Sequence, residues 1–490
     1  MNTLFFEPIA YWSPHFETCL EIMQGYIDSG ASVTLIGCDA SLPICDVNPE
    51  HDLSMCLQCI SKRKQGLRML TPVTSINYIS LDDLFVGSDL PAAQRDWNFS
   101  TIEQLNEYKI DQYDIGMSVA SSLMSYYRTP TLDFVSARDK LHKFLFASYR
   151  TYYAIKNYLL SERPDEVYIF NGRFAILRSV FRLCQQYAID CFIHERGANI
   201  YKYSVTKNAL PHDISNKVRE IQAYWDKAPP DRRVPVAEQF YYDRAGGKQQ
   251  SWFSFVANQE KGLLPECWDP QKRNLVIFNS SEDEFSSIGE EWKNHLYQSQ
   301  LDGLRRIVAD LSVQKNVHVY LRMHPNLTGV HNESVEGLYH ITGNNFTLIP
   351  PESKISTYAL IRAANTVMSF GSTVGIEAAF WGKPSILAGK SFYRELGSVY
   401  LPMTHEEVIR MALSNLEPKD RTGALMYGYY LNTFGRDYKY FEAHEIFSGR
   451  FKGKFVRPSI AIRSTCYLID VLRLQKLLPL FIKSTTAGTG

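Results

Sequence analysis

The feature that most constrains the fold of this chain is an alternation of strands and helices that occurs in two separate series. The first series opens with an apolar strand at 3–6, a helix at 14–27 and a strand at 32–36, reached through Gly30. The second series opens with a strand at 275–278. This alternation is typical of doubly wound parallel sheets. The sequence therefore predicts an α/β protein with two Rossmann-type domains.

Further elements follow in both series. The first continues with a helical stretch at 102–160 and strands at 166–170 and 190–193. The second continues with helices at 292–311, 356–363 and 373–381 and strands at 317–321, 347–349, 366–369 and 385–387. Between the two series, residues 226–247 are polar and carry prolines and glycines, which predicts a linker.

A length of 490 residues exceeds what one hydrophobic core usually organises. We expect a first Rossmann-like domain at 1–245 with a helical insertion, and a second Rossmann-like domain at 246–430. A helical tail at 431–490 is expected to cross back and pack on the first domain.

Composition excludes one class of partner. Lys plus Arg equals Asp plus Glu at 52 each, so no overall charge attracts nucleic acid. The first residues carry no basic leader, and no run of about 18 apolar residues occurs. We therefore expect a cytoplasmic protein whose nine cysteines are thiols or metal ligands.

Polar residues follow the strand at 366–369. This strand ends at Ser369, and Gly371, Ser372 and Thr373 stand where the next helix begins. Backbone N–H groups and hydroxyls at a helix N-terminus bind phosphate. The alternative is that Ser372 or Thr373 only caps the helix.

Glu377 lies one helical turn after Thr373, on the same helix face. A carboxylate there could accept hydrogen bonds from both hydroxyls of a ribose. The alternative is an ordinary solvated or capping glutamate, although its neighbours are apolar. A charge in such surroundings requires a partner.

Two other strands of the second series also end in polar residues. Pro325 stops the strand at 317–321 and holds His324 at the sheet edge, where an imidazole could bind phosphate oxygens or donate a proton to a leaving group. Ser280, Ser281 and Glu282 follow the strand at 275–278. The alternatives are a structural histidine and a polar loop.

Three segments of the second series are similar in sequence to a known family of enzymes. The segments 322–327 (RMHPNL), 368–379 (MSFGSTVGIEAA) and 382–384 (GKP) resemble bacterial capsule-polysaccharide glycosyltransferases. These include capsule Kdo transferases and, more distantly, bacterial sialyltransferases and polysialyltransferases. The resemblance covers about 274–400, roughly a quarter of the chain. It implies that His324-Pro325 and Ser372-Thr373 hold the phosphate and ribose of a CMP-activated sugar.

The resemblance also implies a fold and an activity. The fold is GT-B-like, with a cleft between an acceptor-side domain and a donor domain at 246–430. The activity is metal-independent transfer of an acidic sugar, such as Kdo or a sialic-acid-like sugar, from its CMP donor to a capsule or lipopolysaccharide glycan. Three alternatives stay open: a UDP-sugar donor, a CDP-alditol-dependent phosphotransferase of the teichoic-acid type, and a non-catalytic glycan-binding scaffold.

Inverting transfer requires a base that removes the proton of the acceptor hydroxyl. Glu195, after the strand at 190–193, is the first choice, and His15 at the start of the first helix is the second. His15 could instead be a cap or a surface residue. Asn171, Arg173 and Arg196 are predicted to contact substrate. The resemblance places an acid where this chain has Arg196, so the stereochemical outcome stays open.

Cys38, Cys45, Cys56 and Cys59 lie within 22 residues, the last two as a C-x-x-C pair. Four thiols can bind structural zinc tetrahedrally. The alternative is a set of reduced, partly buried cysteines.

The stretch 458–480 has apolar residues at helical spacing, with basic residues between them. Packing against the first domain is the first interpretation. The second is a peripheral contact with anionic lipid at the inner face of the membrane, which would suit a lipid-linked glycan acceptor.

Overall fold

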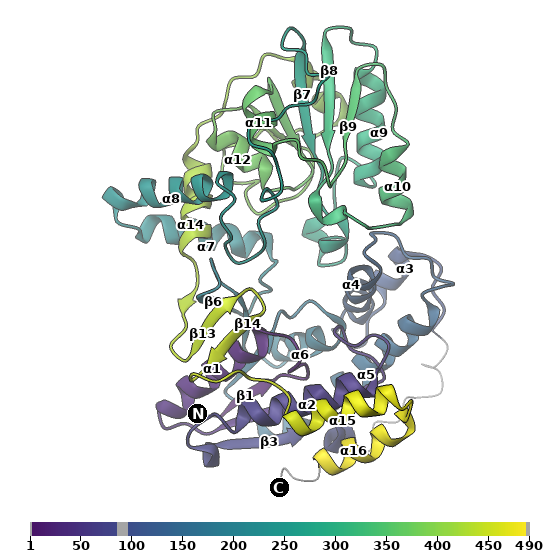
Figure 1. Ribbon diagram of the computed structural model, residues 1–490, viewed down its shortest axis with the longest axis vertical. Helices are drawn as coiled ribbons and strands as arrows, with labels where there is room; N and C mark the ends of the chain where they lie inside the picture. Colours follow the sequence, from purple (N-terminus) through teal and green to yellow (C-terminus); the bar gives the residue numbers. More distant parts are fainter. Residues whose placement is uncertain (1, 86–96, 487–490) are drawn as a thin grey trace. The chain divides into compact units, whose positions relative to one another are not determined.

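The computed structural model describes residues 2–85 and 97–486, which form two compact α/β units (Figure 1). Unit 1 comprises Met1–Tyr127, Leu132–Pro211 and Gly435–Gly490, and unit 2 comprises Arg128–Thr131 and His212–Phe434. The predicted fold class, α/β with two Rossmann-type domains, is confirmed. The predicted return of the chain to the first unit is also present.

Unit 1 is built on a seven-stranded sheet of order β12-β6-β5-β4-β1-β2-β3. Its strands are β1 (Thr3–Phe6), β2 (Val33–Gly37), β3 (Ile76–Ser80), β4 (Glu166–Phe170), β5 (Asp190–Arg196), β6 (Lys202–Lys207) and β12 (Arg436–Asp437). The run from β3 to β5 is parallel, whereas β6 and β12 add antiparallel strands at one edge.

Helices and one hairpin surround this sheet. They are α1 (His15–Asp28), α2 (Leu53–Leu67), α3 (Ile102–Glu107), α4 (Ile115–Tyr127), α5 (Arg138–Glu162), α6 (Ala175–Gln186), α15 (Ile460–Val471), α16 (Leu478–Thr486) and the hairpin β13 (Phe441–Glu445) and β14 (Ser448–Phe451). The hairpin contributes Phe441 and Phe451 to a core that also contains Phe5 and Phe16. Segments more than 400 residues apart in the sequence therefore share one core.

Unit 2 is built on a five-stranded, fully parallel sheet of order β11-β10-β7-β8-β9. Its strands are β7 (Arg273–Phe278), β8 (Val317–Arg322), β9 (Phe346–Ile349), β10 (Thr366–Ser369) and β11 (Ser385–Leu387). Its helices are α7 (Ile214–Lys227), α8 (Pro230–Ala245), α9 (Gln300–Leu311), α10 (Glu333–Tyr339), α11 (Thr357–Ala363), α12 (Val374–Phe380), α13 (His405–Leu413) and α14 (Thr422–Thr433).

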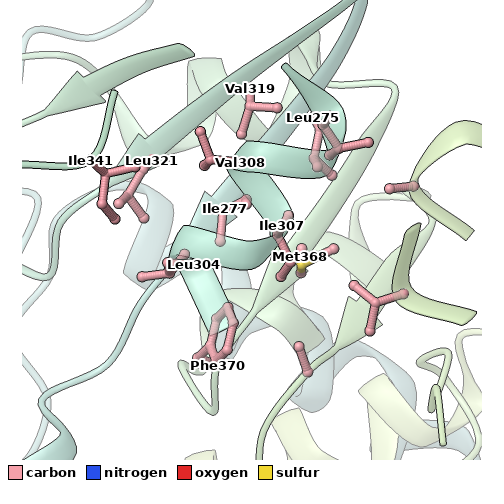
Figure 2. Packing of buried hydrophobic residues seen from close by; sticks show 14 of the residues in the cluster. Leu275, Ile277, Leu304, Ile307, Val308, Val319, Leu321, Ile341, Met368 and Phe370 are labelled. Carbon is pink, nitrogen blue, oxygen red and sulfur yellow. The ribbon is translucent and has the colours of Figure 1, made fainter. Parts of the chain in front are cut away.

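One face of this sheet packs on α9 (Figure 2). Leu275 and Ile277 of β7 alternate along the strand and point toward Leu304, Ile307 and Val308 of the helix. The other face, with Val276 and Phe278, packs on residues of α11. Burying both faces explains why these strands read as continuous apolar runs.

The two sheets share a strand order. Counting only the parallel strands, both run third-second-first-fourth-fifth in chain order. The chain direction along the sheet therefore reverses between β1 and β4 in unit 1 and between β7 and β10 in unit 2. Loops at the carboxyl ends of strands beside such a reversal form the ligand crevice of open α/β sheets.

The predicted linker at 226–247 is wrong. Most of it is helix α8, which begins at Pro230 and buries Ala237, Phe240 and Tyr241. Proline is favoured in the first turn of a helix, so Pro230 starts this helix instead of marking a linker. As α7 and α8 belong to unit 2, the units divide at Pro211 and His212, earlier than the predicted boundary at 245/246.

The start of α9 is also corrected. The helix begins at Gln300, not at 292, because the Ser299 side chain accepts a hydrogen bond from the Asp302 amide and caps it.

The tail predicted as helical at 431–490 is only partly helical, because its first part forms β12 and the hairpin of β13 and β14. Its later part forms the helices α15 and α16, which contact α2 in unit 1 (Figure 1). Cys466, Ile469, Leu478 and Ile482 are buried there with Leu57 and Ile60. The expectation that the apolar positions of the tail pack as core is only partly correct, because most of them are exposed: Leu468, Val471, Leu472, Leu474 and Leu477. Across residues 2–85 and 97–486, no helix has the length and apolarity needed to cross a membrane.

Candidate functional site

A cavity of about 390 Å³ opens in unit 2 at the carboxyl ends of β7, β8 and β10. This is the place where the strand order reverses, so the cavity occupies the expected ligand crevice. Most of the predicted donor-site residues line it: Ser280, Ser281, His324, Pro325, Gly371, Ser372, Thr373 and Glu377. Residues far apart in the sequence are thus brought together by the topology of one sheet.

The His324 imidazole is held by its neighbours in a defined tautomer. Its backbone N–H donates to the Asn279 Oδ1 at 2.8 Å, which ties the end of β8 to the loop after β7. Its Nδ1 accepts a hydrogen bond from the Asn326 amide at 3.2 Å. Since Nδ1 accepts, the proton of the neutral ring lies on Nε2, which is then a hydrogen-bond donor.

The same imidazole is neutral at physiological pH. Burial, together with the positive charges of Arg244, Arg322 and Arg128, lowers the pKa of His324 to about 4. Of the two predicted modes of action, the structure favours a neutral hydrogen-bond donor over a protonated acid in the ligand-free state.

The loop after β10 passes very close to another backbone segment. Gly371 has φ +105°, and a Cβ there would lie 2.6 Å from the Lys390 carbonyl oxygen, so only glycine fits. The Ser372 Oγ accepts from the Val374 amide at 3.3 Å, which is a local capping contact. The Thr373 Oγ1 accepts from the Arg244 guanidinium at 3.2 Å. Thr373 itself makes no side-chain cap to α12, which has seven residues.

Glu377 is buried on α12, with 1% of its surface exposed, and both of its carboxylate oxygens have protein partners. Oε1 accepts from Arg244 Nε at 2.9 Å, and Oε2 accepts from the Tyr358 hydroxyl at 2.5 Å. The sequence correctly indicated that this charge requires a partner. Binding of a ribose by Glu377 stays a prediction.

Two predicted residues lie outside the cavity lining. Ser369 is fully buried, with its hydroxyl 3.1 Å from that of Tyr393, so it braces the sheet. Glu282 turns instead to the start of α9, where its carboxylate accepts from the Gln300 amide at 3.1 Å. Burial raises the pKa of Glu282 to about 7.

Arg322, the last residue of β8, lines the cavity and was not predicted as a site residue. Arg322 is 3% exposed, and its guanidinium donates to the carbonyl oxygens of Pro350, Pro351 and Ser353. Its Nε–H is buried with no hydrogen-bond partner. Burial lowers the pKa of Arg322 to about 10, so the group stays charged at neutral pH. A charged residue ending an otherwise apolar strand was the available signal.

Aromatic side chains form another part of the lining. Trp252 and Phe255, from the segment after α8, lie there with Phe278 and Phe285. The Phe255 ring stands edge-on to the His324 imidazole, with 5.1 Å between centroids. Flat apolar surfaces of this kind suit a nucleobase. Sequence reasoning made no prediction for Trp252 and Phe255, because they lie between the predicted linker at 226–247 and the first strand of the second series.

In unit 1, a second group of polar residues lies at the carboxyl ends of β4 and β5. Glu195 lies within β5 and not after the strand as predicted, because β5 continues to Arg196 through its pairing with β6. Asn171 Nδ2 donates to Glu195 Oε1 at 2.5 Å, so these two predicted residues lie side by side. Asn171 has φ +56° and is buried. Burial raises the pKa of Glu195, while the hydrogen bond from Asn171 opposes that rise. A carboxyl with a raised pKa suits a general base.

His15, the second predicted base, is buried at the start of α1. Its ring lies 4.0 Å from that of Phe170, and burial lowers the pKa of His15 well below its usual value. Its helix-start position agrees with the sequence, but it is not the surface residue considered there. The nearby pair of His194 and Glu7, with Nε2 and Oε2 3.6 Å apart, was not predicted.

The two predicted substrate-binding arginines have protein contacts. The Arg196 guanidinium donates to the Ile446 carbonyl oxygen at 3.0 Å and lies over the Phe447 ring. The Arg173 guanidinium lies over the Phe174 ring at 4.4 Å. Contact with substrate stays a prediction for both.

The predicted zinc site is not supported. Cys38, Cys45, Cys56 and Cys59 line one small cavity of unit 1. Nevertheless, in the part of the chain that the structure describes, no three His, Cys, Asp or Glu side chains are grouped so that they could hold a metal ion. The Cys56 sulfur instead accepts from Asn48 Nδ2 at 3.3 Å, and burial raises the pKa of that thiol to about 12.

The chain was compared with known proteins by sequence and by structure. Neither models of protein families nor the curated proteins give a match to the sequence. Among solved structures, the KpsC β-Kdo 2,4 transferase of Thermosulfurimonas dismutans is similar, with 13% identity over 62% of this chain and 88% of that chain and a TM-score of 0.37. The UDP-GlcNAc 2-epimerase of Neisseria meningitidis bound to UDP-GlcNAc is similar with 12% identity over 84% and 90%, and a TM-score of 0.26. Identities and TM-scores this low do not establish a family.

Proposed function

We propose that unit 2 binds a nucleotide-activated sugar and that the protein is a metal-independent glycosyltransferase. One observation carries the proposal. At the point where the strand order of unit 2 reverses, a single cavity combines a hydrogen-bonding histidine, hydroxyl groups and a buried arginine with aromatic side chains. An activated sugar presents matching chemistry, namely a phosphate, hydroxyls and a base.

In this proposal the phosphate lies against His324 and Arg322. The neutral imidazole donates through Nε2, and the Arg322 Nε–H, which has no protein partner, supplies a further donor. Negative charge develops on the nucleotide phosphate as it leaves. Fixed donors in a cavity shielded from water stabilise that charge strongly. The histidine need not be protonated for this role.

The remaining lining would hold the nucleoside. Ser280, Ser372 and Thr373 offer hydroxyls beside the phosphate position, and Phe255 offers a flat surface for the base. Because Arg244 and Tyr358 already occupy the Glu377 carboxylate, a ribose contact there would add to these bonds or displace one of them.

For the donor we propose a CMP-linked acidic sugar, such as Kdo or a sialic-acid-like sugar. The support is the resemblance of the segments around His324 and Ser372 to capsule glycosyltransferases, together with the arginines near His324, which would favour an anionic sugar. The proposed acceptor is a glycan of a capsule or lipopolysaccharide, lipid-linked at the cytoplasmic face of the membrane.

The proposed base is Glu195 of unit 1, oriented by Asn171. Glu195→Gln removes the base but keeps an oxygen that can accept from Asn171, so transfer should be abolished while nucleotide binding stays intact. His15→Asn provides the comparison, since His15 is the second candidate. Near-normal turnover of Glu195→Gln would remove Glu195 from the mechanism.

Calorimetric titration with CMP, CDP, UDP and GDP tests the donor site. We expect CMP to bind most tightly and His324→Ala to weaken it by about tenfold or more, the usual value of a hydrogen bond to a charged group. His340→Ala, an exposed histidine on the same unit, is the matched control. Preference for CDP would favour an alditol phosphotransferase, preference for UDP a different sugar donor, and no nucleotide binding a glycan-binding scaffold.

A further inference from the structure

The two C-terminal helices of unit 1 expose a large apolar face. Ile460, Tyr467 and Leu480 are 73%, 69% and 65% exposed, and Leu468, Val471 and Leu472 are each more than half exposed. Single exposed apolar residues are normal, but neighbouring ones on one helix pair form a patch. Such patches usually mark a surface that another body covers.

This face is distinct from the one that holds the helices in place. Cys466 and Ile469 of α15, with Leu478 and Ile482 of α16, are buried against α2. The Lys64 ammonium of α2 also donates to the Thr485 carbonyl oxygen near the end of α16. The helices are therefore anchored to unit 1 on one side (Figure 1), and their exposed leucines are not needed for that packing.

Basic side chains lie among the exposed apolar ones. Residues 460–486 contain Arg463, Arg473, Lys476 and Lys483, all exposed, and only one acid, Asp470. Basic and apolar residues on the same amphipathic helix are the signature of a helix that lies in a lipid interface, where cations meet anionic headgroups. Tyr467 adds an aromatic side chain, and tyrosine is enriched at the interface between membrane and water.

We propose that α15 and α16 bind the surface of an anionic lipid bilayer, with their exposed apolar side chains inserted among the lipids. A second copy of the chain fits this face less well. A symmetric pair would bring the same basic residues together without acids to neutralise them. The lipid surface is independent of the nucleotide cavity, although under the proposed function it would bring the enzyme to a lipid-linked acceptor.

Vesicle co-sedimentation of the full-length protein tests this. The vesicles contain phosphatidylcholine alone or phosphatidylcholine with phosphatidylglycerol. We expect binding to the anionic vesicles that falls with salt. Leu468→Ser with Leu472→Ser should weaken it by about tenfold or more, and so should Arg473→Glu with Lys476→Glu. Val135→Ser, which changes an exposed apolar residue of unit 1 outside α15 and α16, should bind like wild type.

Thermal unfolding of each variant checks that the fold is kept, which is expected because the changed side chains are exposed. No binding to anionic vesicles, or equal binding to neutral ones, would overturn the proposal. So would light scattering that shows a wild-type dimer and a monomeric Leu468→Ser, Leu472→Ser variant, because a second copy would then cover the face. A failure of the lipid-binding proposal would not change the result of the CMP titration, which tests the nucleotide site of unit 2 separately.

Discussion

At the scale of single residues, Arg322 is a buried cation whose hydrogen-bond partners are neutral carbonyl oxygens. Carbonyl dipoles stabilise the charge only partly, and desolvating an arginine is costly. An anion bound in the cavity would complete its surroundings. Under the proposed function, that anion is the phosphate of the nucleotide.

Arg322→Gln should raise the dissociation constant of CMP by about 10- to 100-fold, since a charge-assisted hydrogen bond contributes about 1.5–3 kcal/mol. Glutamine can still donate to the carbonyls of the 350–353 loop, which limits the structural damage. Calorimetry measures the affinity, and circular dichroism checks the fold. Arg305→Met, at an exposed arginine on α9, should bind CMP normally. A folded Arg322→Gln variant with unchanged affinity would contradict the assignment.

His324 should make stability depend on pH. Its folded pKa of about 4 is depressed from an unfolded value of about 6.5. Between these values the unfolded state takes up a proton that the folded state does not, so stability falls as pH drops from about 6.5 to about 4. Denaturant unfolding at pH 7 and pH 5 should show wild type losing up to about 2 kcal/mol relative to His324→Gln.

The control for this experiment is His340→Gln, at an exposed histidine, which should follow wild type at both pH values. If nuclear magnetic resonance shows His324 titrating near its ordinary pKa, the neutral-donor role would be wrong.

The sequence could predict residues that follow strands but not residues that approach from elsewhere. His324, Ser372 and Gly371 come after strands of one sheet, and such loops meet at one edge regardless of the intervening sequence. Arg244 reaches the cavity from the last turn of α8, which had been interpreted as a linker. Ser369 failed for a different reason, because side chains alternate along a strand and its hydroxyl turns to Tyr393.

At the scale of elements, the loop between β10 and α12 depends on close backbone approach. Gly371 combines a positive φ with contact to the Lys390 carbonyl, whereas Gly382, at the end of α12, has φ +72° and open space. A substitution at Gly382 therefore measures only the cost of a positive φ, whereas one at Gly371 adds the cost of a steric clash.

Gly382→Ala should cost about 1–2 kcal/mol of stability, the strain of a left-handed residue. Gly371→Ala should cost more and should also weaken CMP binding, because the loop must move away from Lys390. Denaturant unfolding and calorimetry measure both effects. Equal losses in the two variants, with CMP affinity unchanged, would show that the close approach does not matter for the site.

Helices and strands were predicted correctly where the pattern of apolar residues in the sequence matched the burial of the element in the fold. The strands of unit 2 are buried on both faces, so their apolar runs were clear, and each lies within a few residues of its predicted position. The antiparallel strands β6 and β12 gave no such signal, because they are short or mix polar with apolar residues. The α8 helix was missed because its prolines and charges outweighed the spacing of its few buried residues.

At the scale of the whole molecule, unit 1 is completed only after the chain has left it and built unit 2. Unit 1 needs the late segment because β13 and β14 bring large apolar side chains to α1 and β1. No local pattern reports a contact between segments this far apart in sequence. The predicted crossing back of the tail came from the family resemblance, not from periodicity.

This dependence predicts where a distant mutation acts. Phe451 is fully buried beside Phe5 and Phe16. Phe451→Ala should destabilise unit 1 by about 3–5 kcal/mol, the usual cost of removing a buried phenylalanine. In hydrogen exchange, the amides of β1 and β2 should lose protection far more than those of β7 and β8. Phe447→Ala, at a 43% exposed phenylalanine in the same hairpin, should leave β1 protected.

Calorimetry should find CMP bound normally by both variants, because the cavity belongs to unit 2. Equal loss of protection in the two sheets would instead mean that the chain unfolds as one cooperative body.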